Sequence, residues 1–288
     1  EDYDLDLLHV HYAIPHSIAA MLAQQMVAAR KRLPFITTLH GTDITLVGVD
    51  RSYFPITKFS IEKSDGITSI SDDLRRHTYE VFGVENEIRV IHNFVNAELY
   101  RPAASPPSGE KRLMHISNFR PVKRVVDCVR ILAEVRKRTA AHLYMVGDGP
   151  DRPEAHRAAR ELGVEKHVTF MGKQDHVQRI FPGMHVLLMP SEMESFGLAA
   201  LEAMSCGVPP VATRVGGVPE LVTHGVDGYL EPVGDIAAQA ARVVELLTDD
   251  ALHKRMADAA RRTAVERFAS SIIIPQYEQY YRDVLGGH

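Results

Sequence analysis

The sequence predicts an α/β fold in which parallel sheets are covered by helices on both faces. Short apolar runs recur along the chain, and each is followed by a turn signal and then by a stretch with helical periodicity. The runs are almost continuously apolar, as expected for strands that are buried on both faces. The 288 residues fit two domains of ordinary size, and 45% hydrophobic with 24% charged residues is typical of globular proteins.

Strand and helix predictions alternate over most of the chain. Strands are predicted at residues 7–11, 35–39, 66–69, 88–91, 112–116, 142–146, 168–171, 186–189, 210–213 and 229–230. Helices are predicted at residues 17–30, 71–82, 122–138, 153–162 and 198–205, and the chain is helical after residue 235. Such alternation is the pattern of parallel sheets joined by crossover helices.

The composition changes at residues 101–109, where prolines and small polar residues predict an exposed linker. The strand–helix alternation restarts after it. We therefore expect a first domain over residues 1–101, a second over residues 102–267, and a last helical segment over residues 268–288.

Charge, apolar runs and cysteine content exclude several classes of protein. The formal net charge is −4 with acids and bases mixed along the chain, so no basic surface for nucleic acid is expected. No apolar run approaches the roughly 20 residues that span a bilayer, so no membrane partner is expected. The only cysteines are Cys128, in a predicted helix, and Cys206, at the end of another, which argues against disulfides and favours a cytoplasmic protein.

The most informative segment is residues 189–207. A predicted strand ends at Pro190, a loop carries Glu194, and a helix begins near Gly197 with Glu202 one turn inside it. Ligands of open α/β sheets bind at the carboxyl ends of strands, and the backbone N–H groups at the start of the helix suit a diphosphate. Solvated carboxylates flanking a helix are an equally good interpretation of the two glutamates taken alone.

A second segment, residues 117–124, follows the first strand after the linker. Its loop is expected to bring Arg120 and Lys123 to the same sheet edge as Glu194. Fixed positive charge there could stabilise a departing phosphate without a metal. The alternative is a basic first turn of an exposed helix, which we prefer for Arg124.

A third segment, residues 37–43, places His40 at a strand end, where it could donate a hydrogen bond to a ligand. A purely structural histidine is the more common case at such a position.

No metal site is expected. Asp2, Asp4 and Asp6 are interpreted as solvated, and His9 and His11, although they share a strand face, have no evident third ligand.

Together these segments are similar to the retaining glycosyltransferases of family 4, which carry an E-x7-E motif on the GT-B fold. Here the motif runs from Glu194 to Glu202, and segments 207–209, 216–222 and 225–230 match as well. The resemblance implies two Rossmann-like domains whose parallel sheets face a cleft, with the last helix crossing back to the first domain. It also implies a metal-independent hexosyltransferase that uses a UDP-sugar as substrate and needs no cofactor.

The resemblance assigns roles on the donor side. Glu202 is expected to bind the ribose hydroxyls and Glu194 the transferred hexose, while Lys123 supplies positive charge. The donor site would also include Ser195, Phe196, Gly197 and Leu198, the last two through backbone N–H groups to the diphosphate. Asn118 stands where the family usually has arginine, and Arg120 is expected to take over that role.

On the acceptor side, the resemblance places His40 beside the sugar near the reacting centre, as a catalytic residue with Glu194 and Lys123. Tyr12 and Thr42 are the expected acceptor contacts. Lys58 stands where close relatives carry arginine, and it is a candidate for binding an acceptor carboxylate.

Segments 9–17, 39–45, 59–65, 91–95 and 116–124 are most similar to the members of this family that act in bacillithiol synthesis. That resemblance implies UDP-GlcNAc as donor, L-malate as acceptor, and a homodimer. The alternatives are a family-4 enzyme with another donor or acceptor and a catalytically silent UDP-sugar-binding fragment. The fragment alternative arises because the family begins with a strand and a glycine-rich loop, and this chain starts beyond them. The first domain is therefore expected to be incomplete.

Overall fold

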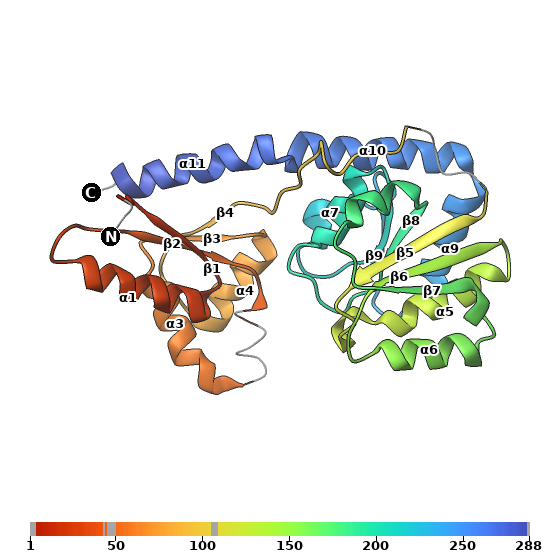
Figure 1. The fold of residues 1–288 in the computed structure, drawn as a ribbon, viewed down its shortest axis with the longest axis horizontal. Coiled ribbons are helices and arrows are strands. Elements are labelled where there is room, and N and C mark those ends of the chain that lie inside the picture. Colours follow the sequence, from red (N-terminus) through yellow and green to blue (C-terminus); the bar gives the residue numbers. More distant parts are fainter. Residues whose placement is uncertain (1–3, 43, 45–49, 105–108, 287–288) are drawn as a thin grey trace. The chain divides into compact units, whose positions relative to one another are not determined.

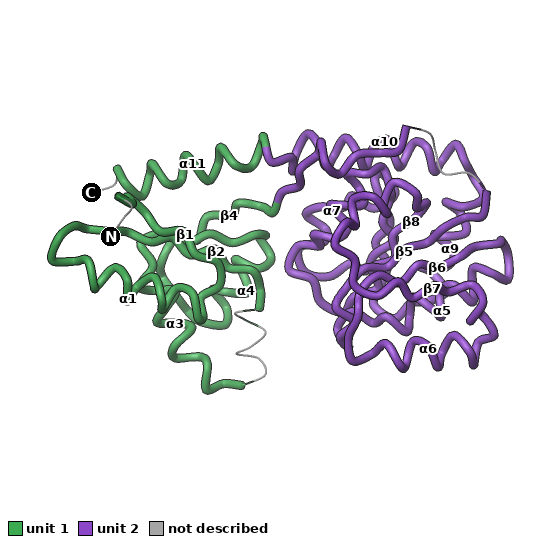
Figure 2. Tube along the Cα trace, viewed as in Figure 1, with its two compact units in different colours: residues 1–93, 271–288 green, residues 94–270 purple. Residues whose placement is uncertain are grey.

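The computed structural model describes residues 4–42, 44, 50–104 and 109–286 (Figure 1). The chain divides into two compact units (Figure 2). Unit 1 comprises residues 1–93 and 271–288, and unit 2 comprises residues 94–270. None of the helices in these described ranges is long and apolar enough to cross a membrane.

Unit 1 is built on a four-stranded parallel sheet in the order β1-β2-β3-β4. The strands are β1 (Leu8–His11), β2 (Phe35–Leu39), β3 (Gly66–Ser69) and β4 (Ile88–Val90). The intervening helices are α1 (Ile18–Val27), α3 (Phe54–Lys63) and α4 (Asp72–Phe82). α4 begins at Ser71, whose side chain accepts a hydrogen bond from the Leu74 amide, and ends at Gly83 in the left-handed region.

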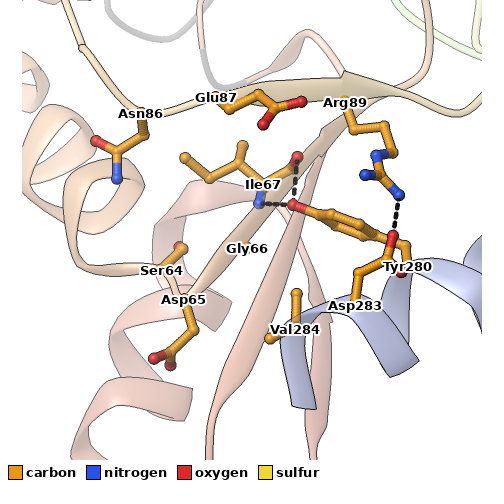
Figure 3. A pocket seen from close by; sticks show the side chains of 10 residues that line it. All are labelled: Ser64, Asp65, Gly66, Ile67, Asn86, Glu87, Arg89, Tyr280, Asp283 and Val284. Carbon is orange, nitrogen blue, oxygen red and sulfur yellow. Dashed lines mark hydrogen bonds and ion pairs between the residues drawn. The ribbon is translucent and has the colours of Figure 1, made fainter. Parts of the chain in front are cut away.

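The C-terminal helix α11 (Ser270–Gly286) packs on the sheet of unit 1. The Tyr280 hydroxyl accepts from the Ile67 amide at 2.9 Å and donates to the Ile67 carbonyl at 3.2 Å (Figure 3). Arg89 forms an ion pair with Asp283 at 2.6 Å. A β-carbon on Gly66 would lie 2.9 Å from the Tyr280 hydroxyl, so a glycine at this position allows the helix to approach the strand.

Unit 2 contains a six-stranded parallel sheet in the order β10-β9-β8-β5-β6-β7. The strands are β5 (Lys111–Ser117), β6 (Ala141–Gly147), β7 (Val168–Gly172), β8 (Val186–Met189), β9 (Pro210–Thr213) and β10 (Tyr229–Glu231). This is the doubly wound Rossmann order, and the winding reverses between β5 and β8. A ligand site is therefore expected at the carboxyl ends of these two strands.

The helices of unit 2 cover this sheet. They are α5 (Val125–Arg136), α6 (Arg152–Glu161), α7 (Leu198–Ser205), α8 (Val218–Leu221), α9 (Ile236–Thr248) and α10 (Asp250–Phe268). α5 contacts α6 and α9, and α7 contacts α10. In Figure 1, α5 and α6 lie on one side of the sheet and α10 on the other. The core between sheet and helices is built mainly from buried aliphatic side chains.

The ten predicted strands and the five predicted helices are confirmed, with ends that shift by a few residues. Helix α3 was not predicted. Ile61 is fully buried on it, whereas Ile56 and Phe59 are 44% and 41% exposed. Its apolar residues therefore do not form the single stripe by which an amphipathic helix is recognised.

Unit 2 begins before the boundary predicted at residue 102. The Val95 amide donates to the Phe268 carbonyl at 2.9 Å, and the Arg261 guanidinium on α10 donates to the carbonyls of Ala97 and Tyr100. These long-range bonds join residues 95–100 to α10, and no local change of composition could reveal them. Of the predicted linker, residues 105–108 lie outside the described part of the chain.

Candidate functional site

The loops that follow β5 and β8 are bound to each other at the switch point of the unit 2 sheet. The Lys123 ammonium lies 2.6 Å from Glu194 Oε1, which also accepts from the Ser191 hydroxyl at 2.8 Å. The Glu192 amide donates to the Val122 carbonyl at 2.8 Å. The structure thus brings together the cation and the carboxylate that the sequence predicted at this edge.

The loop after β5 needs unusual backbone geometry. Phe119 and Arg124 have left-handed φ angles of 40° and 49°. Gly147 and Gly149 lie against this loop, since β-carbons there would fall 1.8 Å from the Ser117 carbonyl oxygen and 2.1 Å from that of Asn118. The glycine-rich turn after β6 therefore allows the β5 loop to pass close by. Asn118 and Arg120, both predicted donor contacts, are exposed on this loop.

A buried histidine within β5 supports the loop that follows this strand, and it was not predicted from the sequence. His115 Nδ1 donates to the Leu188 carbonyl at 2.9 Å, and Nε2 lies 2.8 Å from the Ser117 hydroxyl. Burial lowers the pKa of His115 to about 4, so the ring is neutral and Nε2 accepts from Ser117. The Ser117 oxygen in turn accepts from the Phe119 amide at 3.2 Å. A lone histidine inside an apolar strand gives no signal of this bridge between β5 and β8.

The loop after β8 leads into α7, which begins at Gly197 with a φ of 96° and without a side-chain cap. The first backbone N–H groups of α7, beginning with that of Leu198, therefore mark a helix end that favours an anion. The Gly217 amide donates to the Glu194 carbonyl at 3.1 Å and holds the loop from the other side. Ser195 and Phe196 complete the loop, with Phe196 buried.

Glu202 lies one turn into α7 and is partly buried. Burial raises the pKa of its carboxyl group, and a hydrogen bond with the Tyr100 side chain opposes that shift. Tyr100 was not predicted as part of the site, because it lies far from α7 in the sequence. Its carbonyl is held by Arg261 and by the Ser205 hydroxyl. The partly buried Glu202 carboxylate, next to the Tyr100 phenol, is well suited to accept hydrogen bonds from the two hydroxyl groups of a diol.

In unit 1, side chains at the carboxyl ends of β1 and β2 form a second cluster. His11 Nδ1 and His40 Nε2 share a hydrogen bond of 2.8 Å, and the rings of Tyr12 and His40 are 4.9 Å apart. Tyr12 has a φ of 73°, and its amide donates to the Thr38 carbonyl at 2.9 Å. The predicted Tyr12 and His40 are thus neighbours, and His11 joins them.

His40 in this cluster and the neighbouring His9 are held neutral. Burial, together with the neighbouring His11, lowers the pKa of both His9 and His40 to about 4. His9 also hydrogen-bonds the hydroxyls of Thr38 and Tyr281, each at 2.7 Å. His40 can therefore act near pH 7 as a neutral hydrogen-bonding group and not as a cation.

Lys58 is not joined to this cluster. Its ammonium donates to the Gly83 carbonyl at 3.3 Å and lies 3.6 Å from Glu62. Because α4 runs from the carboxyl end of β3 back toward the amino end of β4, Gly83 lies at the sheet edge opposite His40. The acceptor role of Lys58 comes from the resemblance to relatives that carry arginine there, and it stays a prediction. Thr42 is exposed two residues beyond His40.

Comparison with known proteins identifies the class to which this fold and these sites belong. Residues 96–263 match the sequence profile of the glycosyl transferases group 1, and residues 1–99 match that of glycosyltransferase family 4. The chain belongs to this glycosyltransferase family and is a glycosyltransferase. It has the GT-B fold, as solved structures of the class do.

Among curated relatives, the chain is 44% identical to the N-acetyl-alpha-D-glucosaminyl L-malate synthase of Bacillus anthracis, over 98% of this chain and 76% of that protein. It is 27% identical to the D-inositol 3-phosphate glycosyltransferase of Streptomyces bingchenggensis, over 98% of this chain and 68% of the relative.

Two solved structures illustrate the fold similarity. The sucrose-phosphate synthase of Thermosynechococcus elongatus has a TM-score of 0.86 at 24% identity, covering 100% of this chain and 75% of the other. Anabaena HepE in complex with UDP has a TM-score of 0.85 at 22% identity, covering 96% and 79%.

Proposed function

We propose that this glycosyltransferase moves N-acetylglucosamine from UDP-GlcNAc to the hydroxyl group of L-malate, the first step of bacillithiol synthesis. The observation that carries this proposal is the 44% identity, over nearly the whole chain, to a relative named for that product. The same comparison favours these substrates over those of the inositol phosphate enzyme, which is 27% identical. The class of reaction itself follows from the family.

Unit 2 is the proposed donor site. Glu202 would bind the ribose hydroxyls, the N-terminus of α7 at Gly197 and Leu198 would bind the diphosphate, and Glu194 would contact the hexose. The 2.6 Å ion pair between Lys123 and Glu194 supports this assignment, because the cation and the carboxylate proposed to contact the hexose are in direct contact. Asn118, Arg120, Ser195 and Phe196 belong to the same two loops.

Unit 1 is the proposed acceptor site, with Tyr12 and Thr42 as acceptor contacts and His40 beside the transferred sugar. A neutral His40 suits a sugar hydroxyl, to which it can donate or from which it can accept a hydrogen bond. Lys58 remains a proposed contact for an acceptor carboxylate, and it would have to leave the Gly83 carbonyl to make that contact.

Retention of configuration is proposed to follow a front-face course. The bond between the anomeric carbon and the β-phosphate oxygen breaks, and the malate hydroxyl oxygen bonds to that carbon on the same face. The leaving phosphate takes the hydroxyl proton. Lys123 and the α7 N-terminus would stabilise the charge that develops on the phosphate, so the scheme needs neither a metal nor a cofactor. A homodimer in the cytoplasm is part of the same proposal.

The test is UDP release from UDP-GlcNAc with and without L-malate, with the product mass recorded. We expect malate-dependent release and a product mass equal to that of GlcNAc-malate. Release with a different donor or acceptor only would replace these substrates within the same family. UDP binding without turnover of any donor would support the silent-fragment alternative and would overturn the proposal.

A further inference from the structure

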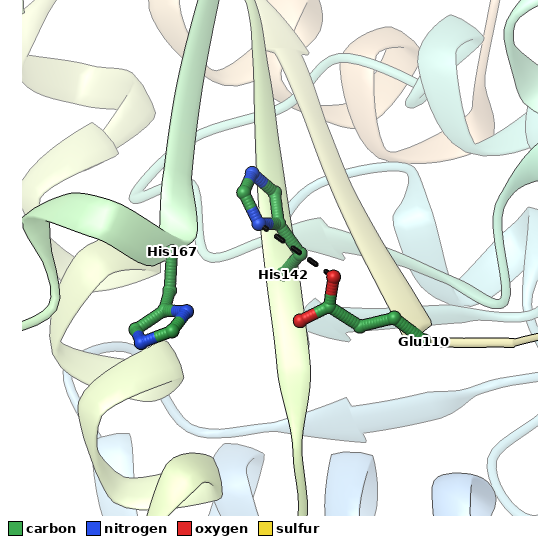
Figure 4. Close-up of side chains that lie close together, drawn as sticks. All are labelled: Glu110, His142 and His167. Atoms are coloured by element: carbon green, nitrogen blue, oxygen red, sulfur yellow. Dashed lines mark ion pairs between the residues drawn. The ribbon is translucent and has the colours of Figure 1, made fainter.

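Two histidines and one glutamate from three neighbouring strands gather at the amino edge of the unit 2 sheet, opposite the donor loops. Glu110 directly precedes β5, His142 is the second residue of β6, and His167 directly precedes β7. β5, β6 and β7 are adjacent in the sheet, and the pairing of Leu143 with Val168 places His142 beside His167. Figure 4 shows the Glu110 carboxylate turned toward His142, with His167 beside them.

The donor atoms of the three side chains lie within 4.8 Å of one another, and His142 Nδ1 is 4.0 Å from a Glu110 oxygen. In a tetrahedral zinc site with bonds of about 2.0–2.1 Å, ligand atoms are separated by roughly 3.3 Å. The donor atoms therefore need to close by about 1–1.5 Å at most. The Glu110 side chain is 47% exposed and free to make that adjustment, whereas the His142 side chain is only 16% exposed.

The orientation of His142 is fixed in the way that metal-binding histidines usually are. Its Nε2 lies 2.8 Å from the Thr169 hydroxyl, and its ring packs 4.8 Å from that of Tyr144. With Nε2 donating its proton to Thr169, the lone pair of the ring is on Nδ1, the atom that faces Glu110. A polar partner on the far ring nitrogen is the recurring outer contact of metal-bound imidazole.

We propose that Glu110, His142 and His167 form a binding site for a divalent transition-metal ion, best suited to Zn²⁺. Two imidazoles and a carboxylate are ligands that Zn²⁺ accepts, and water would complete the coordination. The ion would link the amino ends of β5, β6 and β7. It would lie at the edge opposite Lys123 and Glu194 and would therefore be separate from glycosyl transfer.

The test uses the full chain, stripped of metal with a chelator and free of any affinity tag. Titration calorimetry with ZnCl₂ is expected to show one saturable equivalent per chain. His142→Ala and His167→Ala should each weaken binding at least tenfold, and Thr169→Val by about tenfold to a hundredfold, the usual effect of losing an outer partner. His176→Ala, which removes an exposed histidine outside the cluster, should bind as the parent protein does.

A second readout and a folding control make the result decisive. Co²⁺ bound by the parent protein should give the visible absorption of a tetrahedral site, and Glu110→Gln, at an exposed position, should abolish it. UDP binding measured on every variant shows that the donor site is intact. The proposal is overturned if the parent protein shows no saturable Zn²⁺ binding, or if the cluster variants bind Zn²⁺ as tightly as His176→Ala does.

Discussion

At the scale of single residues, Lys123 is expected to have the largest effect on turnover. It is the cation bound to Glu194 at the switch point, and it would act on charge that develops only as the phosphate leaves. Lys123→Ala should lower kcat by about 10²–10³-fold, the usual loss for one such group, with a much smaller change in the KM for donor. Steady-state kinetics checks this, with Lys137→Ala as control, since Lys137 pairs with Glu134 on the surface of unit 2. Equal kinetics of the two variants would contradict the role.

His11 is expected to position His40. The hydrogen bond of 2.8 Å between their rings restricts the rotation of His40. His11→Ala should lower kcat by about tenfold, the value of one hydrogen bond of about 1.4 kcal/mol, and leave UDP affinity unchanged. His77→Ala, at an exposed position on α4, is the matched control. Loss of UDP binding in His11→Ala would instead indicate damage to the whole fold.

The sequence predicted the sheet-edge positions of residues in the loops that follow strands, and it missed the residues that support those loops. His40 directly follows β2, and Lys123 and Glu194 lie in the loops after β5 and β8, so the α/β pattern places them at sheet edges. His115 and Tyr100 contact the site from inside a strand and from a distant segment, and only the folded chain brings them there. The role of Lys58 stays a prediction, and its contact with the Gly83 carbonyl could not be foreseen from its position on a helix.

At the scale of elements, the docking of α11 depends on one phenol. The Tyr280 hydroxyl satisfies both the amide and the carbonyl of Ile67 in the interior of unit 1. Tyr280→Phe should destabilise unit 1 by about 1–3 kcal/mol, because it leaves buried backbone groups unpaired. Hydrogen exchange of the Ile67 amide is the direct measurement and should speed up. Tyr53→Phe, at a 43% exposed position, should leave that exchange rate unchanged; an equal rate in Tyr280→Phe would refute the docking role.

Strand positions could be predicted because each apolar run is short and bounded by turn residues. The start of unit 2 could not, because it depends on Arg261 binding carbonyls more than 160 positions away in the sequence. The partners of the last helix could not be predicted either, since the pairing of Tyr280 with Ile67 joins the two separate segments of unit 1. Element boundaries follow local signals, whereas packing partners follow long-range contacts.

At the scale of the whole molecule, the buried histidines are expected to lower the folding stability of the protein as the pH falls. The pKa values of His9, His40, His115 and His185 are each lowered to about 4, with burial the largest cause. In the unfolded chain these groups bind protons near pH 6.5. Their contribution to stability is therefore complete above pH 6.5 and is lost as the pH falls from 6.5 toward 4.

The measurement is Tm between pH 7.5 and 5, a range in which most carboxyl groups stay ionised. The parent protein should lose Tm steadily below pH 6.5. His115→Asn should start from a lower Tm at pH 7.5, because the bond to Leu188 is perturbed, but should lose less on acidification. An identical pH dependence in the two proteins would show that His115 takes no part in it.

The central claim is that unit 2 carries a UDP-sugar site at its switch point. The most direct test is to titrate the variants Glu202→Gln and Glu192→Gln with UDP by calorimetry. Glu192 is an exposed acid on the same loop and serves as the control. Loss of charged hydrogen bonds to the ribose, worth about 1.5–3 kcal/mol, should weaken UDP binding by about ten- to a hundredfold in Glu202→Gln. The same variant should be at least as stable as the parent at pH 7, since burial raises the pKa of Glu202 and its charge is costly there. Weaker binding in Glu202→Gln alone would support the site, and unchanged binding in it would contradict the account.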